Sequence, residues 1–251
     1  LRASAEWRGN PSRTVCRTTP STFPRMLRFS FLDTLLRRGV DLAEELPREG
    51  QARRFVRESL PWLFVMGAAY GFCMGAYNII ATETVEIRYA LVSAVKVPIH
   101  LLLTSALCFP ALYVFGIAGG AKIRPGLLWA CLMAALLLMC VLQVALMPVV
   151  LFFLSTIHRY AVVKLVHLSV WTISGVVALR FFGRMVRKLD DSLAKNGQLM
   201  FFWMLTFGLV GAQMGWMLRP FIGDPGEPFR VTRDFGGNIL IDIFRMMRRL
   251  G

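Results

Sequence analysis

Acidic side chains are scarce in this sequence, and they are absent from its long apolar segments. Only 15 of the 251 residues are Asp or Glu, and charged residues of both signs make up 18% of the chain, against about 25% in soluble globular domains. Proton-coupled carriers and intramembrane aspartyl proteases need carboxyl groups inside the membrane. The lack of such groups in the apolar segments argues against both classes.

The usual signatures of catalysis and metal binding are missing as well. The chain has no glycine-rich phosphate loop, no His-Glu-x-x-His and no Gly-x-Ser-x-Gly. Its cysteines lack the spacing of metal ligands, and most of them fall inside apolar segments, where a thiol packs as a small apolar group. They are Cys16, Cys73, Cys108, Cys131 and Cys140. The sequence therefore predicts a protein that is not an enzyme and that holds neither a metal nor another cofactor.

Apolar residues, in contrast, form 56% of the chain and are collected in blocks. A helix needs about 20 such residues to cross the hydrocarbon core, whereas the strands of a membrane barrel need only about 10. The predicted fold class is all-α, a polytopic membrane helical bundle of about five transmembrane helices with amphipathic helices at both ends. The third span would be roughly 42 Å long, so it must tilt, protrude or bend near Pro148. The predicted spans are 62–81, 95–117, 127–154, 161–179 and 199–218.

Two of these spans carry glycines at helical spacing. In the first span Gly67, Gly71 and Gly75 lie four residues apart, and in the fifth span Gly211 and Gly215 share a face in the same way. Small residues on one face let two helix backbones approach closely in lipid. Both faces are interpreted as helix-packing surfaces of the bundle.

The chain is predicted to divide into four parts. Residues 1–25 are basic, rich in Ser and Thr and nearly free of acid, which fits either a transit peptide or an extension ahead of a start at Met26. Residues 26–59 form an amphipathic cytoplasmic segment, 60–222 the transmembrane bundle, and 223–251 a tail with a basic amphipathic helix. The first amphipathic segment fits contact with the membrane surface and packing on its own protein equally well.

The formal net charge is +14, and most basic residues flank the spans. No compact soluble domain organises them for nucleic acid, so the predicted partners are membrane lipids and other membrane proteins, and not nucleic acid. Basic residues are more numerous on the side of the N-terminus, which predicts a cytoplasmic N-terminus in a bacterial inner membrane, with an organelle membrane as the alternative. The basic C-terminal helix would favour the cytoplasmic leaflet as well, yet five spans place it on the opposite side.

Ionisable residues in or beside the spans gather near one membrane face. Lys96 and His100 lie four residues apart near the start of the second span, and Lys164 and His167 lie three apart near the start of the fourth. These two spans run in the same direction, and Arg219 follows the fifth span on the same side. Because ionisable residues inside a membrane are functional candidates, these five are predicted to form a polar cluster that binds a carboxylate, a phosphate or a lipid head group.

Other interpretations of the same residues stay open. The two lysines and the arginine lie close to span ends, where their side chains can extend to the head groups as interfacial anchors. The two histidines fit either hydrogen-bonded packing residues or axial ligands of a haem. Glu83 and Glu86 also fall on this side of the membrane.

The last span and its exit read GAQMGWMLRPFIG over residues 211–223, and the second span begins with AVKVP at 94–98. This pattern resembles a recurring signature of uncharacterised bacterial multi-pass membrane proteins, over about residues 61–244. The span number, the cytoplasmic N-terminus and the proline in the second span also resemble Yip1-like five-span proteins. Neither resemblance implies a catalytic residue.

The sequence thus predicts a non-enzymatic integral membrane protein that acts as an accessory, scaffold or membrane-organising component. The glycine faces, the amphipathic helices at both ends and the missing catalytic groups support this prediction. The alternative is a small carrier or channel for an anionic solute or a lipid head group, which would use the predicted polar cluster. A haem-binding electron carrier is a third hypothesis.

Overall fold

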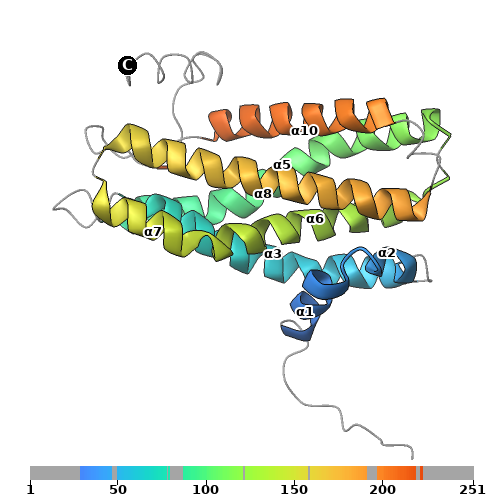
Figure 1. Cartoon of the computed structure of the whole chain (residues 1–251), viewed down its shortest axis with the longest axis horizontal. Helices are drawn as coiled ribbons and strands as arrows, with labels where there is room; N and C mark the ends of the chain where they lie inside the picture. Colours follow the sequence, from blue (N-terminus) through green and yellow to red (C-terminus); the bar gives the residue numbers. More distant parts are fainter. Residues whose placement is uncertain are drawn as a thin grey trace, which may run out of the picture.

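The computed structural model describes residues 29–46, 50–77, 79, 87–120, 122–157, 159–190, 197–218 and 221–222. Within these ranges the chain folds into helices without a strand, which confirms the predicted all-α bundle (Figure 1). The predicted N-terminal extension and the predicted C-terminal amphipathic helix lie outside the described residues. The helices are α1 (Phe29–Arg38), α2 (Leu42–Glu45), α3 (Gln51–Gly75), α5 (Ile87–Ala118), α6 (Pro125–Ala145), α7 (Met147–Thr156), α8 (Tyr160–Leu189) and α10 (Gly197–Met217).

Among the described residues, four helices are long and apolar enough to cross a membrane, judged by length and composition. They comprise α5, α6, α8 and most of α10, and they coincide with the second to fifth predicted spans. The first predicted span is not among them. It falls in the second half of α3, whose first turns are polar and whose described helix ends at Gly75. The end of this predicted span, residues 78, 80 and 81, lies outside the described residues.

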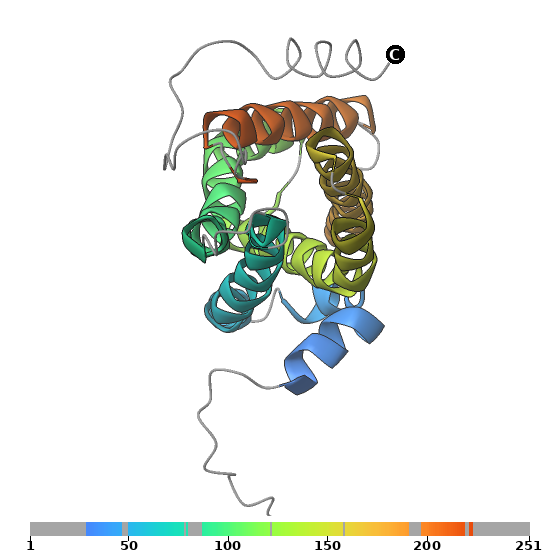
Figure 2. The same ribbon diagram turned by 90° about the vertical axis from the view of Figure 1, so that its left-hand side faces the viewer.

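The long helices form a closed ring. α3 packs against α5 and α6, α6 packs against α8, and α10 packs against both α5 and α8. Seen along the bundle, these helices follow one another around its axis (Figure 2). Consequently α5 and α8 face each other across the interior of the ring, and side chains from both can meet there.

The backbones of α3 and α5 approach each other very closely. A Cβ atom built on Gly71 would lie 2.3 Å from the carbonyl oxygen of Ser93, and one on Gly75 would lie 2.5 Å from the Cα of Ala90. On the same face, a Cβ on Gly67 would lie 3.3 Å from Pro98. Only glycine lets the two backbones approach this far, and in lipid such packing replaces the hydrophobic effect as the force between helices.

The third predicted span is broken in the structure. α6 ends at Ala145 and α7 begins at Met147, directly before Pro148. Proline lacks an N–H and its ring clashes with the carbonyl four residues earlier, so it interrupts a helix interior but fits the first turn of a new helix. Of the tilt, protrusion or bend that the length of this span required, the structure shows an interruption of the helix directly before Pro148.

The predicted amphipathic segment forms two short helices outside the ring. Leu32 and Leu35 of α1, together with Leu46 after α2, are buried in the main apolar core. The chain turns between the two helices at Gly39, where an added Cβ would lie 2.8 Å from the ring of Phe181 in α8. The apolar side of this segment therefore packs on the protein's own bundle.

A pair of ionic contacts fastens α2 to the end of α8. Lys188 Nζ lies 2.7 Å from Asp41 Oδ1 and 3.0 Å from Glu44 Oε1. The nearby backbone N–H of Lys122 donates a hydrogen bond of 2.9 Å to Asp190. We call this end of the bundle the α2 end, and the opposite end, where α7 lies, the α7 end.

Gly71→Ala is expected to disrupt the bundle. The added methyl group meets backbone atoms that cannot move aside, so the free energy of unfolding should fall by about 1–3 kcal/mol or more. Gly208→Ala is the matched control, because nothing lies within 4 Å of a Cβ at Gly208. Thermal denaturation in detergent micelles, followed by circular dichroism, measures both variants. Equal stability of the two would contradict the close α3–α5 contact.

Acidification is expected to loosen α2 from α8. The hydrogen bond and the charge of Lys188 hold the pKa of Asp41 below its ordinary value of 3.8. Because this pKa is lower in the folded protein, the ion pair stabilises the fold fully above the pKa that Asp41 has in the unfolded chain. The stabilisation is lost as the pH falls through the lower pKa of the folded protein. Because both side chains are exposed, the effect is small. Unfolding of wild type and Asp41→Asn should differ at pH 7 and converge below pH 3.8; a difference that is independent of pH would rule this out.

Candidate functional site

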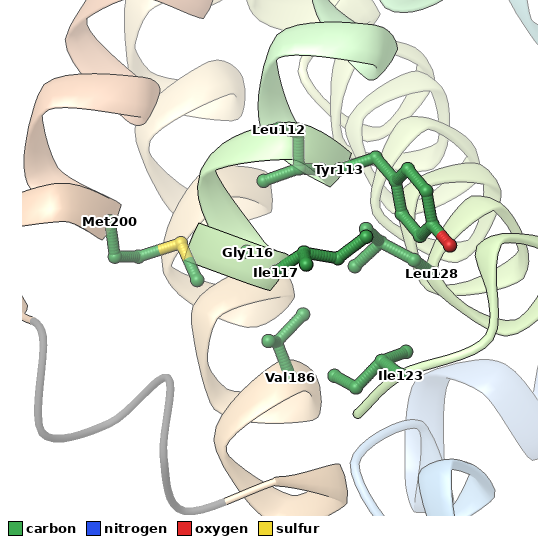
Figure 3. Close-up of a pocket in the computed structure, with 8 residues that line it drawn as sticks. All are labelled: Leu112, Tyr113, Gly116, Ile117, Ile123, Leu128, Val186 and Met200. Carbon is green, nitrogen blue, oxygen red and sulfur yellow. The ribbon is translucent and has the colours of Figure 1, made fainter. Parts of the chain in front are cut away.

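The two predicted Lys–His pairs lie at the α7 end of the bundle. α5 and α8 run in the same direction, since the last turns of both reach the same apolar pocket at the α2 end (Figure 3). Lys96 and His100 in α5 and His167 in α8 are buried, whereas Lys164 is half-buried. Arg219 lies outside the described residues.

Both histidines point their rings toward aromatic side chains from other helices. The hydroxyl of Tyr70 in α3 lies 3.0 Å from Nδ1 of His167, in a fully buried contact. The ring of Trp171 in α8 packs edge-on against His100, 5.3 Å between centroids, and lies 6.5 Å from the ring of Tyr70. Side chains from α3, α5 and α8 thus meet inside the ring.

Two further polar residues belong to this region. Thr104 lies one turn beyond His100 in α5 and is 2% exposed. Gln143 in α6 is 0% exposed. A Cβ on Gly175 in α8 would touch Met139 in α6. Because the two helices are antiparallel, Gln143, one turn after Met139, lies at the same height as Trp171, one turn before Gly175. We define the core cluster as these residues and their neighbours: Tyr70, His100, Thr104, Gln143, His167 and Trp171.

Several polar atoms of the core cluster are buried without a hydrogen-bond partner among the residues that the structure describes. They are Nδ1 of His100, Oγ1 of Thr104, Nε2 and Oε1 of Gln143, Nε2 of His167 and Nε1 of Trp171. A buried polar atom without a partner costs about 1–3 kcal/mol, and native structures contain few of them. Their concentration in one layer of the bundle marks this layer as a candidate binding site.

The glycines of the predicted fifth-span face lie next to this layer. A Cβ on Gly211 would lie 3.4 Å from Thr104, and one on Gly215 would lie 3.6 Å from the ring of His100. Both distances are ordinary van der Waals contacts, so an alanine would fit, and only larger side chains would press on Thr104 or His100.

Lys96 lies at the mouth of the core cluster. Its Nζ donates a hydrogen bond of 2.8 Å to the carbonyl oxygen of Leu218 at the end of α10. The same ammonium group lies 5.8 Å from the ring centroid of Phe221, whose ring in turn lies 6.0 Å from that of His100. A cation at a helix C-terminus is favourable because it meets the negative end of the helix dipole.

Three side chains hold the segment that follows α10 across the α7 end. Besides the bond from Lys96, Ser93 donates to the carbonyl of Phe221, and Tyr160 donates to that of Ile222 over 3.0 Å. We call this arrangement the clasp. It places the ring of Phe221 beside that of His100, on the side of the core cluster that faces the α7 end.

Lys164 contacts a residue outside the core cluster. Its Nζ lies 4.3 Å from the ring centroid of Tyr160, near the start of α8. A half-buried lysine whose ammonium rests on a tyrosine near a span end fits the interfacial anchor that the sequence left open.

The site residues predicted from the sequence do not include Tyr70, Thr104, Gln143 or Trp171. Gln143 carried the clearest signal, because it is the one amide side chain in the apolar helix α6. The other three resemble ordinary packing residues until the helices are placed around one interior. Among the described residues, no group of three or more His, Cys, Asp or Glu side chains is arranged to hold a metal ion.

The α2 end of the ring interior differs in chemistry. The pocket there is lined by side chains of α5, α6, α8 and α10 and by Ile123 before α6 (Figure 3). Its lining is apolar except for the hydroxyl of Tyr113. The polar atoms of the interior are therefore concentrated at the α7 end.

Gln143→Met is expected to stabilise the purified protein. The variant keeps a side chain of similar length and removes two buried atoms without partners, each of which costs about 1–3 kcal/mol. Exposed Gln198 offers the control, since Gln198→Met should change stability by less than about 0.5 kcal/mol. Denaturation in detergent micelles measures both. A loss of stability in Gln143→Met would mean that the amide already has partners in the purified protein.

Comparison with known proteins identifies no relative of this chain. It matches no protein-family model, no curated protein and no solved structure. The role of the core cluster is therefore inferred from its own chemistry, and the resemblances noted in the sequence stay predictions.

Proposed function

We propose that this membrane protein is a small carrier for a polar, anionic solute, which binds at the core cluster. The observation that carries the proposal is the set of buried polar atoms on α5, α6 and α8 that have no hydrogen-bond partner within the described part of the chain. A bundle that only had to be stable would fill these positions with apolar side chains of similar shape. A ligand that completes the hydrogen bonds accounts for their presence.

The shape of the bundle supports a carrier. The ring of helices surrounds an interior that is polar at the α7 end and apolar at the α2 end. Trp203 and Phe182 fill the space toward the α2 end, with ring centroids 5.2 Å apart. Transport by this bundle would require a second state in which the clasp or this aromatic contact opens.

The charges at the α7 end favour an anion. The basic residues described there are Arg88, Lys96, Arg159 and Lys164, and the helices α5, α6, α7, α8 and α10 contain no Asp or Glu. Glu83 and Glu86, which the sequence places at this end, lie outside the described residues. A positive end of the bundle attracts anionic solutes and anionic head groups alike.

The scaffold hypothesis loses one of its supports. The face with Gly67, Gly71 and Gly75 packs against α5 of the same chain, so this face does not serve a partner protein. The apolar side of α1 is likewise turned to its own bundle. These contacts favour a function inside the bundle over one on its surface.

We also propose the orientation of the bundle. Most described basic residues lie at the α2 end, and basic residues are retained on the cytoplasmic side. The N-terminus and the α2 end would then face the cytoplasm, and the core cluster would open to the opposite side. The basic residues of the α2 end are Arg37, Arg38, Arg53, Arg54, Arg57, Lys122, Arg124, Arg180, Arg184, Arg187 and Lys188.

Uptake into liposomes tests the carrier. Purified protein is reconstituted, and the uptake of labelled pyruvate, phosphate and chloride is measured at constant pH. At least one anion should enter at least tenfold faster than in protein-free liposomes, and the double variant Gln143→Leu, His167→Phe should return uptake to the background. Tyr113→Phe at the α2 end should keep the wild-type rate.

If no anion enters faster than in protein-free liposomes, the carrier proposal is wrong. The same holds if the double variant folds normally and still transports at the wild-type rate.

A further inference from the structure

We propose that the ligand of the core cluster is a monocarboxylate, whose two oxygens accept hydrogen bonds from Trp171 and His167 on one face of α8. This inference rests on the proposed function, because it names the solute class that the same site takes. The assignment of the ligand follows from which of the unpartnered atoms can only donate a hydrogen bond. For His167 this is decided by its contact with Tyr70, and for Trp171 by the chemistry of the indole.

The contact with Tyr70 determines the tautomer of His167. If the Tyr70 hydroxyl donates to Nδ1, the imidazole carries its proton on Nε2, and one buried group stays unpaired. If the hydroxyl accepts from Nδ1 instead, its own hydrogen and the Nε2 lone pair are both buried without partners. The first arrangement has fewer unpaired groups and is favoured. Nε2 of His167 is therefore an N–H donor.

Trp171 supplies a second donor beside it. An indole N–H can donate and cannot accept a hydrogen bond, and Nε1 of Trp171 has no partner among the described residues. His167 and Trp171 are four residues apart on α8, so both lie on one face, about 6 Å apart along the axis. A carboxylate has two acceptor oxygens and no donor, so a single carboxylate can bridge the two N–H groups.

Gln143 adds a third donor from α6, level with Trp171. Its Nε2 is also buried without a partner among the described residues and can only donate, while its Oε1 can only accept. A bound water needs acceptors for its own two hydrogens, and Oε1 of Gln143, Oγ1 of Thr104 and one tautomer of His100 can supply them. The N–H groups of His167, Trp171 and Gln143 fit an anion, and buried water is the outcome that the experiment below separates from it.

The charge of the site favours a single negative charge. The fixed donors are uncharged groups, and Lys96 lies one turn from His100 at the mouth of the core cluster. A dianion such as hydrogen phosphate would bring twice the charge into an apolar bundle, where an ion without compensation is strongly disfavoured. The rings of Trp171, Tyr70 and Phe221 around the site suit the apolar remainder of a monocarboxylic acid.

Ligand-dependent stability tests the inference. The unfolding temperature of purified protein in lipid nanodiscs is measured with sodium pyruvate, pyruvamide and sodium phosphate, each against sodium chloride at equal ionic strength and pH 7. Pyruvate should raise the unfolding temperature in a saturable way, and pyruvamide and phosphate should not. Trp171→Phe and Tyr70→Phe should each weaken the apparent affinity for pyruvate at least tenfold. Trp129→Phe, in the first turns of α6, should leave it unchanged.

A measurement on the wild-type chain keeps the test decisive if these variants do not fold. In protein labelled with ¹⁵N at the indole nitrogens of its 6 tryptophans, pyruvate should shift one indole N–H signal downfield. The same measurement with oleate distinguishes a soluble carboxylate from the carboxylate of a membrane fatty acid. A response to oleate but not to pyruvate upholds a carboxylate as the ligand and identifies that ligand as a lipid.

Equal effects of pyruvate and pyruvamide, or an effect of phosphate alone, would overturn the inference. So would the absence of any effect, which would leave buried water as the partner of these atoms. Failure here and failure of the carrier can be told apart. Pyruvate binding without uptake into liposomes upholds the site and overturns the carrier, whereas uptake of chloride or phosphate without pyruvate binding upholds the carrier and overturns the monocarboxylate.

Discussion

The close approach of α3 and α5 is the contact on which the rest of the bundle depends. Because Gly71 and Gly75 have no side chains, the backbone of α3 lies directly on Ser93 and Ala90 of α5. This contact sets the rotation of both helices about their axes. It turns Tyr70, the neighbour of Gly71, into the interior, and it places His100 of α5 on the same inner side, where both meet Trp171.

The position of α10 in turn depends on its contacts with α5. The last turns of α10 lie against His100 and Thr104 through Gly211 and Gly215, and the clasp holds the segment beyond it. α10 otherwise buries little of its surface, since only 11% of its apolar segment is buried inside the bundle. It is the long helix whose movement disrupts the fewest contacts. A carrier of this design would open by moving α10 against a rigid pair of α3 and α5.

The sequence predicted part of the site, and the reason for the rest is physical. Spacing alone places the pair Lys96 and His100 at the same end of the bundle as the pair Lys164 and His167. Both pairs lie near the start of their helix, and helices that run in the same direction start at the same end. Spacing does not state how each helix is rotated relative to its neighbours. Rotation turns His100 and His167 inward, leaves Lys164 half-buried against Tyr160, and brings in Gln143 from a helix that the sequence treated as apolar packing.

The sequence by itself determined the helical class, the apolar lengths of four of the five predicted spans, the break near Pro148 and the end at which the polar residues gather. These properties are local: they follow from apolar length, from the geometry of proline and from the alternating direction of successive spans. Only the tertiary structure decided which glycines meet which backbone, and that polar atoms of three helices lie in one interior without hydrogen-bond partners among the described residues. Those properties depend on the rotation and the order of the helices around the ring, which are set by packing between residues far apart in the chain.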